Sequence, residues 1–309
     1  MGADWPVEAG KPPDGDSSPS GGGGRAVPAE TRSRQECYDD QHRKVSATAR
    51  PSAAEDQARA KKWDQAAEES RWMWGEYQRR WPPEERTPVD RSADPPGSWR
   101  GDRDKYLDQA GNRRVEAACD RIAKREREMI SPAMCRVESQ DADRHLVGFE
   151  NRLKGRDRIK DIVCRRIKRL GRSPEQTVSQ VPDTIRYTFQ YEEEHYARGV
   201  TADVTRLKEQ GFKLSKLWNA WSGEQYKGIN SRWVEPDSGQ RFEVQFHTRI
   251  SFEAKQLTHK AYERLRTRQP DRFEQMVLEA FQKKVAADVS VPRGATDIPD
   301  YPGRDSHAR

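Results

Sequence analysis

Apolar positions follow a helical spacing over residues 53–81, where they recur every three or four residues. They form one stripe made of Trp63, Ala66, Ala67, Ser70, Trp74, Tyr77 and Trp81. Such a stripe is typical of an amphipathic helix, and Pro82-Pro83 predicts its end. We expect this Trp-rich helix to pack on the protein's own core; a docking surface for a partner is the alternative.

Residues 101–291 alternate between the strand period and the helix period and predict one folded domain. The expected elements are a helix over 102–130 that ends at Ser131-Pro132, a strand over 145–154, a helix over 157–170, a strand over 184–191, a helix over 194–210, a strand over 212–218, a hairpin of strands 228–234 and 240–248, and helices over 251–266 and 271–285. This order predicts an α/β (α+β) fold, in which helices surround a mixed sheet of about five strands.

The segments outside this domain show no sustained period. Residues 1–52 are rich in Gly, Pro and Ser, a composition typical of a disordered tail. We expect a linker over 82–100 and a flexible tail over 292–309. Only 33% of the residues are hydrophobic and 35% are charged, which is too polar for the whole chain to form one compact core.

The formal net charge of +6 fits a phosphate-bearing partner and fits a solvated mixed-charge surface equally well. The four cysteines lack metal-site spacing, so we expect free thiols; a bridge between Cys119 and Cys135 is the alternative. No stretch resembles a cleavable signal or a bilayer span. We therefore expect a cytoplasmic protein, or one delivered without a cleavable signal peptide, and no membrane partner.

A cluster of cations lies where the strand predicted over 145–154 turns into the next helix. Arg152 and Lys154 share a strand face, and Gly155 allows the turn. The following helical turn adds Arg156, Arg158 and Lys160. A helix start with several cations is suited to the phosphates of ATP; a solvated basic helix face is the alternative.

The strand predicted over 240–248 has one polar face. Its apolar residues 242, 244 and 246 alternate with Glu243, Gln245 and His247. The three polar side chains therefore project together, either toward water or toward a metal and its surroundings. Magnesium prefers oxygen ligands, which favours Glu243 over His247 as a ligand.

Two further segments carry candidate chemistry. In the polar loop 222–230, Tyr226 is suited to stacking on a base and Lys227 to meeting a phosphate. The alternative is a plain connection in which Tyr226 covers the core. The helix predicted over 251–266 presents on one face Lys255, His259 and Tyr262.

Together these pieces resemble the synthetase domain of the RelA/SpoT nucleotide pyrophosphokinases, the alarmone synthetases. The order is a basic strand-to-helix turn, an Asp-x-Ile-Arg strand, a Tyr-Lys-Gly loop, a Glu-x-Gln-x-x-Thr strand and an Ala-x-x-x-x-His-x-x-Tyr helix. The resemblance runs over residues 145–266 and implies a nucleotidyltransferase-like synthetase fold. Segments 183–189, 226–230 and 242–248 look closest to the branch of actinobacterial nucleotide 3′-pyrophosphokinases and toxin-type synthetases.

The resemblance implies a role for each matching residue. The ATP-binding set would be Arg152, Lys154, Arg158, Lys160 and Arg186. The acceptor-binding set would be Lys216, Tyr226, Lys227, Asn230 and His259. Asp183 and Glu243 would hold Mg²⁺, and these two residues with Gln245 would form the catalytic group.

This sequence departs from the better-known synthetases in three ways. Asp183 stands closer to the strand arginine than their metal-binding aspartate does. Gly228 and Asn230 replace a serine and a histidine, which bears on the identity of the acceptor. No hydrolase-type His-Asp region precedes the domain, so synthesis without hydrolysis is expected.

The implied reaction moves pyrophosphate from ATP to the 3′-hydroxyl of a purine nucleotide and gives products of the (p)ppGpp or (p)ppApp type. A toxin role, with an immunity protein as partner, is part of the same prediction. Two alternatives use the same residues. One is a toxin that pyrophosphorylates the 3′ end of tRNA, and the other is a non-catalytic module that binds a nucleotide or RNA.

Overall fold

The computed structural model describes residues 53–82, 92–102, 105–267 and 270–302. The disordered tail expected over 1–52 lies outside the described residues, as does the end of the chain after residue 302. Among the described residues, no helix combines the length and the apolar character needed to cross a bilayer.

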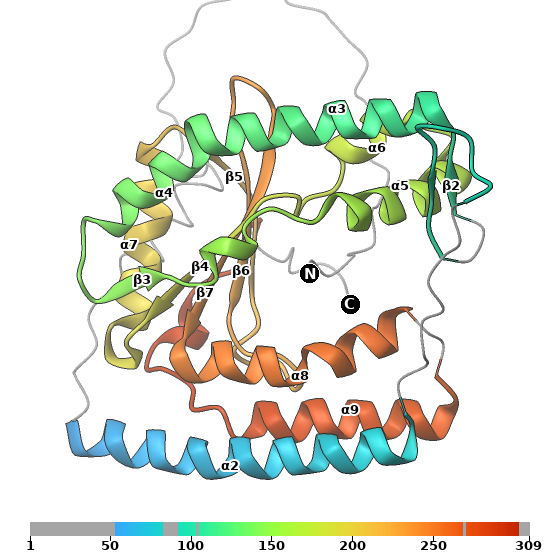
Figure 1. Cartoon of the computed structure of the whole chain (residues 1–309). Coiled ribbons are helices and arrows are strands. Elements are labelled where there is room, and N and C mark those ends of the chain that lie inside the picture. The colour runs from blue at the N-terminus through green and yellow to red at the C-terminus, as the bar shows by residue number, and fades with distance from the viewer. Residues whose placement is uncertain (1–52, 83–91, 103–104, 268–269, 303–309) are drawn as a thin grey trace, which may run out of the picture.

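A mixed sheet of five strands forms the centre of the fold (Figure 1). In spatial order it contains β3 (Arg144–Leu146), β4 (Arg186–Tyr191), β7 (Arg241–Thr248), β6 (Ile229–Val234) and β5 (Lys213–Asn219). Strands β4 and β7 run parallel, and the other neighbouring pairs run antiparallel. The expected α+β fold with a mixed five-stranded sheet is therefore confirmed.

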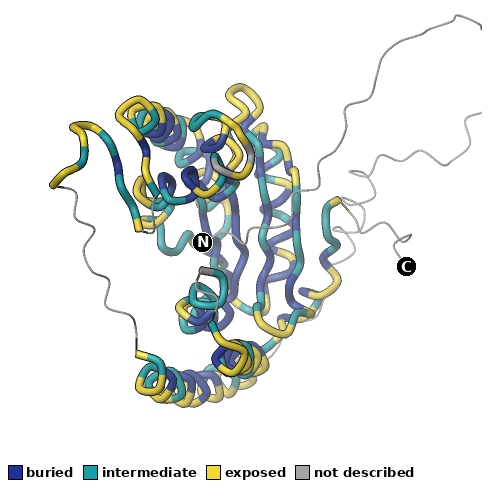
Figure 2. The backbone as a smooth tube through the Cα atoms, turned by 90° about the vertical axis from the view of Figure 1, so that its right-hand side faces the viewer, coloured by how far each residue is buried: buried dark blue, intermediate teal, exposed yellow. Residues whose placement is uncertain are grey.

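Two groups of helices pack around the sheet. One group contains α3 (Gln109–Arg125), α4 (Ser131–Glu138), α5 (Arg156–Leu170), α6 (Pro174–Ser179) and α7 (Tyr196–Glu209). The other contains α2 (Ala53–Arg80), α8 (Arg249–Thr267) and α9 (Arg272–Ala287). Figure 2 shows the strands largely buried and the exposed positions gathered on the outer faces of the helices. This distribution is the one expected where helical stripes face a common core.

The Trp-rich helix α2 packs against α8 and α9 (Figure 1). Trp63 is 1% exposed, and its Nε1 donates a hydrogen bond of 2.6 Å to Glu253 Oε2 on α8. The Tyr77 hydroxyl donates to Glu274 Oε1 on α9 at 2.7 Å. The apolar stripe of α2 thus covers the protein's own core, as expected, while Trp72 remains 66% exposed.

The helix expected to stop at Ser131-Pro132 continues past that point. A π-helical turn (Glu126–Ile130) joins α3 to α4, and Pro132 occupies the first turn of α4. A proline is tolerated at that place because the first residues of a helix need no backbone N–H donor. The sequence pattern also missed the two-stranded ribbon of β1 (Trp99–Arg100) and β2 (Tyr106–Leu107), which lies partly in the expected linker.

The strand expected over 145–154 is much shorter. Pairing with β4 ends at Leu146, and Gly148 takes a left-handed conformation (φ +62°) before a 3₁₀ turn (Phe149–Asn151). The chain then returns to the sheet only at the isolated bridge between Leu153 and Ile185. The cation cluster of residues 152–160, called the basic turn below, therefore begins in an irregular segment, where the alternation of side chains along a strand does not apply.

The segment after residue 292, expected to be a flexible tail, packs on the edge of the sheet as far as residue 302. Ala295 and Ile298 are buried, and Tyr301 forms an antiparallel bridge with Leu217. The Asn219 side chain donates to the carbonyls of Ala295 and Ile298 at 2.8 and 2.7 Å. These bonds attach the segment to β5, which a polar composition with two prolines did not reveal.

We predict that Trp63→Ala lowers the free energy of unfolding by about 3–5 kcal/mol, the usual cost of deleting a buried large aromatic side chain. The loss includes the hydrogen bond to Glu253. Chemical denaturation measures the change. The exposed Trp72→Ala on the same helix is the control and should change stability by less than about 0.5 kcal/mol. Equal effects of both substitutions would contradict the packing of α2 described above.

Candidate active site

Two rows of polar side chains cross the sheet from β4 to β5. Strand register aligns the first row as Arg186, Glu243, Arg232 and Lys216. It aligns the second row as Thr188, Gln245, Asn230 and Trp218. Each strand contributes residues two positions apart, so both rows lie on the same face of the sheet. All eight residues line one cavity.

This cavity has a volume of about 980 Å³, at the upper end of the range for small-molecule sites. Its walls are the basic turn before α5, the loop that carries Tyr226 and one face of α8. The predicted site residues that line it are Arg152, Lys154, Arg158, Asp183, Arg186, Lys216, Tyr226, Asn230, Glu243, Gln245 and His259. Strand β7 with Glu243, the basic turn and the loop that carries Tyr226 therefore line the same pocket.

Two predicted residues do not line this pocket. Lys160 is buried against α3, where its Nζ lies 2.5 Å from Glu116 Oε1. Lys227 Nζ donates to the Trp221 carbonyl at 2.9 Å and borders a small separate recess near α9. The expected ATP-binding role of Lys160 and phosphate-binding role of Lys227 have no support in this geometry, because each amine is held in its own local contact.

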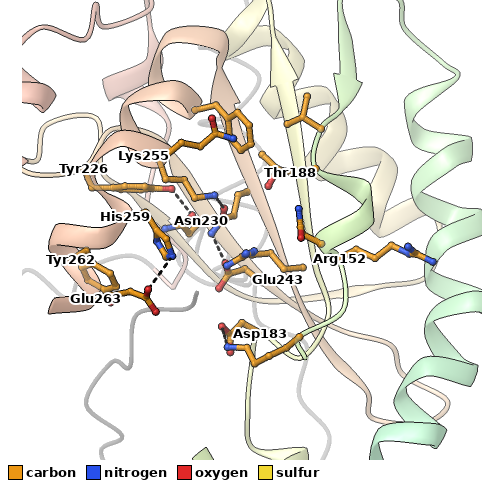
Figure 3. Close-up of a pocket in the computed structure, with 18 of the residues that line it drawn as sticks. Arg152, Asp183, Thr188, Tyr226, Asn230, Glu243, Lys255, His259, Tyr262 and Glu263 are labelled. Atoms are coloured by element: carbon orange, nitrogen blue, oxygen red, sulfur yellow. Dashed lines mark hydrogen bonds and ion pairs between the residues drawn. The ribbon is translucent and has the colours of Figure 1, made fainter. Parts of the chain in front are cut away.

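Asp183 and Glu243 form an acidic pair on the floor of the pocket (Figure 3). They are 5% and 4% exposed. Burial, and next the neighbouring charge of Asp183, raise the pKa of Glu243, while Arg186, Lys255 and Arg232 oppose that rise. Asp183 also pairs with Lys154 from the basic turn. The two carboxylates are thus close enough to influence each other and are surrounded by cations.

The acidic pair fits a magnesium ion that arrives with phosphate. Among the described residues, no three His, Cys, Asp or Glu side chains gather as a ready-made metal cage. Magnesium rarely needs such a cage, because it commonly takes one or two carboxylates and completes its shell with water and substrate phosphates. The oxygens of Asp183 and Glu243 are therefore the donors that would hold it here.

Gln245 links the carboxylate of Glu243 to helix α8. Its Nε2 donates to Glu243 Oε1 at 2.5 Å, and its Oε1 accepts a hydrogen bond from Lys255 Nζ. Burial lowers the pKa of Lys255 to about 7, with repulsion from Arg186 adding to the effect. The sequence pattern placed Lys255 on one face with His259 but gave it no role. Arg232 was missed entirely, although its alternation with Asn230 on β6 was visible.

Tyr226 is fixed in place by hydrogen bonds from its hydroxyl group. The hydroxyl lies 2.9 Å from Asn230 Oδ1 and 2.9 Å from His247 Nε2, and its ring is parallel to Trp218 with centroids 6.0 Å apart. His247 is fully buried behind it and bonds to Ser251 Oγ at 2.8 Å. The interpretation of Tyr226 as a ring that faces a ligand is compatible with its place in the pocket lining.

Gly228 allows the close approach of His247 to the tyrosine loop. A Cβ atom at this position would lie 2.7 Å from the ring of His247, and φ is +144°. His247 was expected to project with Glu243 and Gln245. It lines no part of the pocket and instead supports Tyr226 from behind. Gly228 and the buried histidine thus belong to one packing arrangement.

Arg152 is anchored from outside the pocket. Its Nε donates to Glu126 at 2.7 Å, its guanidinium lies 4.3 Å from the ring centroid of Phe149, and Figure 3 shows it directed away from Glu243. Glu126, in the π-helical turn, also accepts hydrogen bonds from Ser131 and Tyr187. The π-helical turn therefore has a direct connection to the basic side of the pocket, which no helix periodicity predicts.

His259 lines the pocket from α8, with its Nε2 3.7 Å from Glu263 Oε2. Burial lowers the pKa of His259. Glu263 also meets Arg158, at 3.3 Å, so α8 and α5 are joined across the mouth of the pocket. His259 therefore lies in the pocket with the other predicted acceptor-binding residues on its lining, and Glu263 is its immediate partner.

No family model and no curated protein matches the chain. Among solved structures it is similar to a GTP pyrophosphokinase family protein from Streptococcus pneumoniae, with 12% identity and a TM-score of 0.39 over 59% of this chain and 89% of that one. It is also similar to small alarmone synthetase 1 from Bacillus subtilis, with 11% identity and a TM-score of 0.37 over 57% and 91%. It is similar as well to the structure of that synthetase bound to its product pppGpp, with 13% identity and a TM-score of 0.36 over 59% of this chain and 94% of that one.

We predict a pH dependence of stability that arises from His247. Burial lowers the pKa of His247 well below its usual range, so the folded protein keeps it neutral. The unfolded chain binds a proton there near pH 6.5. This contribution is therefore complete above pH 6.5 and is lost at about 1.4 kcal/mol per pH unit as the pH falls toward the folded pKa.

Chemical denaturation at pH 7.5 and pH 5.5 tests this. The difference between the two pH values should shrink by about 1.4 kcal/mol in His247→Gln. The exposed His145→Gln is the matched control and should retain the wild-type difference. An unchanged pH dependence in His247→Gln would contradict the neutral state of this side chain.

Proposed function

We propose that this domain transfers the β,γ-diphosphate of ATP to the 3′-hydroxyl of a nucleotide acceptor. The observation that carries the proposal is the first row of side chains across the sheet, in which the Glu243 carboxylate lies between Arg186 and Arg232. Cations on both sides of one buried carboxylate suit two anionic substrates that react at that carboxylate.

The donor nucleotide is assigned to the side of the pocket formed by the basic turn and β4. Lys154, Arg158 and Arg186 lie there beside Asp183. Arg186 Nη1 is buried and has no hydrogen-bond partner among the described residues, so a phosphate oxygen would satisfy it. Magnesium held by Asp183 and Glu243 would neutralise developing phosphate charge when bound.

The acceptor is assigned to the opposite side, over β5 and β6. The nearly parallel rings of Tyr226 and Trp218 offer flat faces suited to a purine base, and Lys216 provides a cation for its phosphates. Asn230 fixes the tyrosine hydroxyl from below. This arrangement favours a purine nucleotide, with products of the (p)ppGpp or (p)ppApp type; the toxin role stays a prediction from sequence.

The protein's residues contribute mainly alignment and charge. The acceptor 3′-oxygen forms a bond to Pβ, and the bond from Pβ to the bridging oxygen breaks, so that AMP leaves with that oxygen and its electron pair. The hydroxyl proton passes to Glu243, whose buried position and raised pKa favour proton uptake. Arg186 and Arg232 stabilise the negative charge around this centre.

Incubation of the protein with Mg²⁺ and ATP labelled at the β-phosphate, together with one candidate acceptor at a time, tests the function directly. The acceptors are AMP, ADP, ATP, GMP, GDP, GTP and purified tRNA. We expect AMP to form and the label to be transferred to an added purine nucleotide acceptor. Label on tRNA alone would replace the nucleotide acceptor by RNA, and ATP left intact with every acceptor would refute the enzyme.

We predict that Glu243→Gln lowers kcat by at least about 100-fold, the usual scale for one key electrostatic group in a phosphoryl-transfer site. The substitution preserves size but removes the proton acceptor and one metal ligand. Steady-state kinetics with saturating ATP measures the loss. The exposed Glu209→Gln on α7 is the control and should keep full activity. Near-normal turnover of Glu243→Gln would refute the assigned centre.

We predict that Tyr226→Ala weakens acceptor binding by about 1–3 kcal/mol, roughly 5- to 150-fold, because one base-stacking face is lost. The affinity for ATP should change by less than about twofold, because ATP does not stack on this ring. Calorimetric titration of each nucleotide separates the two effects. Tyr226→Phe retains the ring but loses the bonds to Asn230 and His247, so it should lose less acceptor affinity. Equal losses for ATP and acceptor would argue against stacking.

A further inference from the structure

Lys255 is the cation of α8 that reaches into the centre of the pocket. Figure 3 shows it extending from α8 above the sheet, among Asn230, Thr188 and Glu243. Its Nζ donates to Gln245 Oε1 and lies 5.2 Å from the ring centroid of Phe252. The side chain lines the cavity. It therefore belongs to the pocket, although no motif pointed to it.

Lys255 differs from the cations of the turn before α5 and of α5 itself in what balances its charge. Lys154 pairs with Asp183, Arg152 with Glu126, and Arg158 with Glu263. Lys255 has no carboxylate at ion-pairing distance among the described residues, and its hydrogen-bond acceptor is a neutral amide oxygen. An ammonium group has three donors, so two remain to be satisfied.

The surroundings of Lys255 disfavour an isolated positive charge. Burial is the main reason that its pKa falls to about 7, and Arg186 repels it further, while only Glu243 favours the charged form. Buried cations in proteins are normally paired, because desolvation is costly. Arg186 Nη1 is likewise buried without an acceptor. Lys255 Nζ and Arg186 Nη1 thus each retain donor capacity in the cavity that no acceptor among the described residues satisfies.

We propose that Lys255 contacts the diphosphate group during its transfer from donor to acceptor, and so acts as a further catalytic residue. This inference rests on the function proposed above. Lys255 touches Gln245 on β7, the strand between the donor side at β4 and the acceptor side at β6. The anion that occupies this middle position is the group in transit, whose equatorial oxygens carry the transition-state charge.

The contact changes no bond itself. While the acceptor 3′-oxygen bonds to Pβ and AMP departs with the bridging oxygen and its electron pair, Lys255 donates hydrogen bonds to non-bridging oxygens of the moving diphosphate. The hydroxyl proton goes to Glu243, so Lys255 keeps its own proton. The alternative is a structural role, in which Lys255 only holds the Gln245 amide in the orientation that serves Glu243.

Lys255→Gln separates these two roles, because glutamine retains an N–H donor for Gln245 but has no charge. We expect kcat to fall about 100-fold at saturating substrates, with KM for ATP and for the acceptor changed by less than about threefold. Lys255→Arg keeps the charge and should recover a large part of kcat. Lys260→Met, at an exposed site on the same helix, should match the wild type.

Binding of inorganic pyrophosphate with Mg²⁺, followed by calorimetry, gives a readout that does not depend on turnover. Lys255→Gln should weaken pyrophosphate binding about tenfold, in line with the loss of one charge-assisted hydrogen bond. AMP binding should be unchanged. Thermal unfolding identifies a variant that fails to fold, in which case Lys255→Met and Lys255→Arg are compared in the same assays.

Three outcomes would overturn the proposal: full turnover in Lys255→Gln, unchanged pyrophosphate binding in that variant, or equal losses in Lys255→Gln and Lys255→Arg. The failure of this inference is distinct from failure of the function. A wild-type protein that labels no acceptor refutes the function, whereas an active wild-type protein with an equally active Lys255→Gln refutes only the role of Lys255.

Discussion

A carboxylate buried at the middle of a sheet must be compensated, and the placement of Glu243 imposes that requirement on its whole neighbourhood. Glu243 is 4% exposed, and the neighbouring Asp183 makes its charge more costly. The compensation comes from Arg186 on one adjacent strand and Arg232 on the other. Because β4 and β7 run parallel while β6 runs antiparallel, only this register aligns the three residues in one row.

Two helical segments, α8 and the π-helical turn, add further polar contacts around the pocket. Helix α8 sends Lys255 toward Gln245, which donates to Glu243 in turn. At the far side, Glu126 in the π-helical turn holds Arg152 and accepts the hydroxyl of Tyr187. A regular helix over the same residues would rotate Glu126 relative to Ser131 and lose this group of contacts. The π-helical turn therefore fixes the position of Arg152 at the basic side of the pocket.

Alternation along single strands was enough to predict the polar face of β7, and it placed Glu243 and Gln245 correctly in one pocket with the basic turn and Tyr226. The same rule failed at residues 145–154, because Gly148 in a left-handed conformation ends the pairing. It also could not show which face His247 serves, since the close approach at Gly228 is a contact between two strands. Local periodicity determines elements, whereas strand register and loop packing determine the site.

The same distinction explains why two cations predicted from the pattern lie outside the pocket lining, and why two cations that line it were not predicted. Lys160 belongs to a conspicuous basic run, yet α5 turns it toward Glu116 on α3, and Lys227 satisfies a carbonyl of its own loop. Arg232 and Lys255 stand alone in sequence and reach the pocket because β6 pairs with β7 and α8 crosses above them. A cation can serve an anionic substrate only where the fold brings it into the pocket. The unsatisfied donors of Lys255 and Arg186 therefore mark the centre of the pocket more sharply than the dense basic run at its edge.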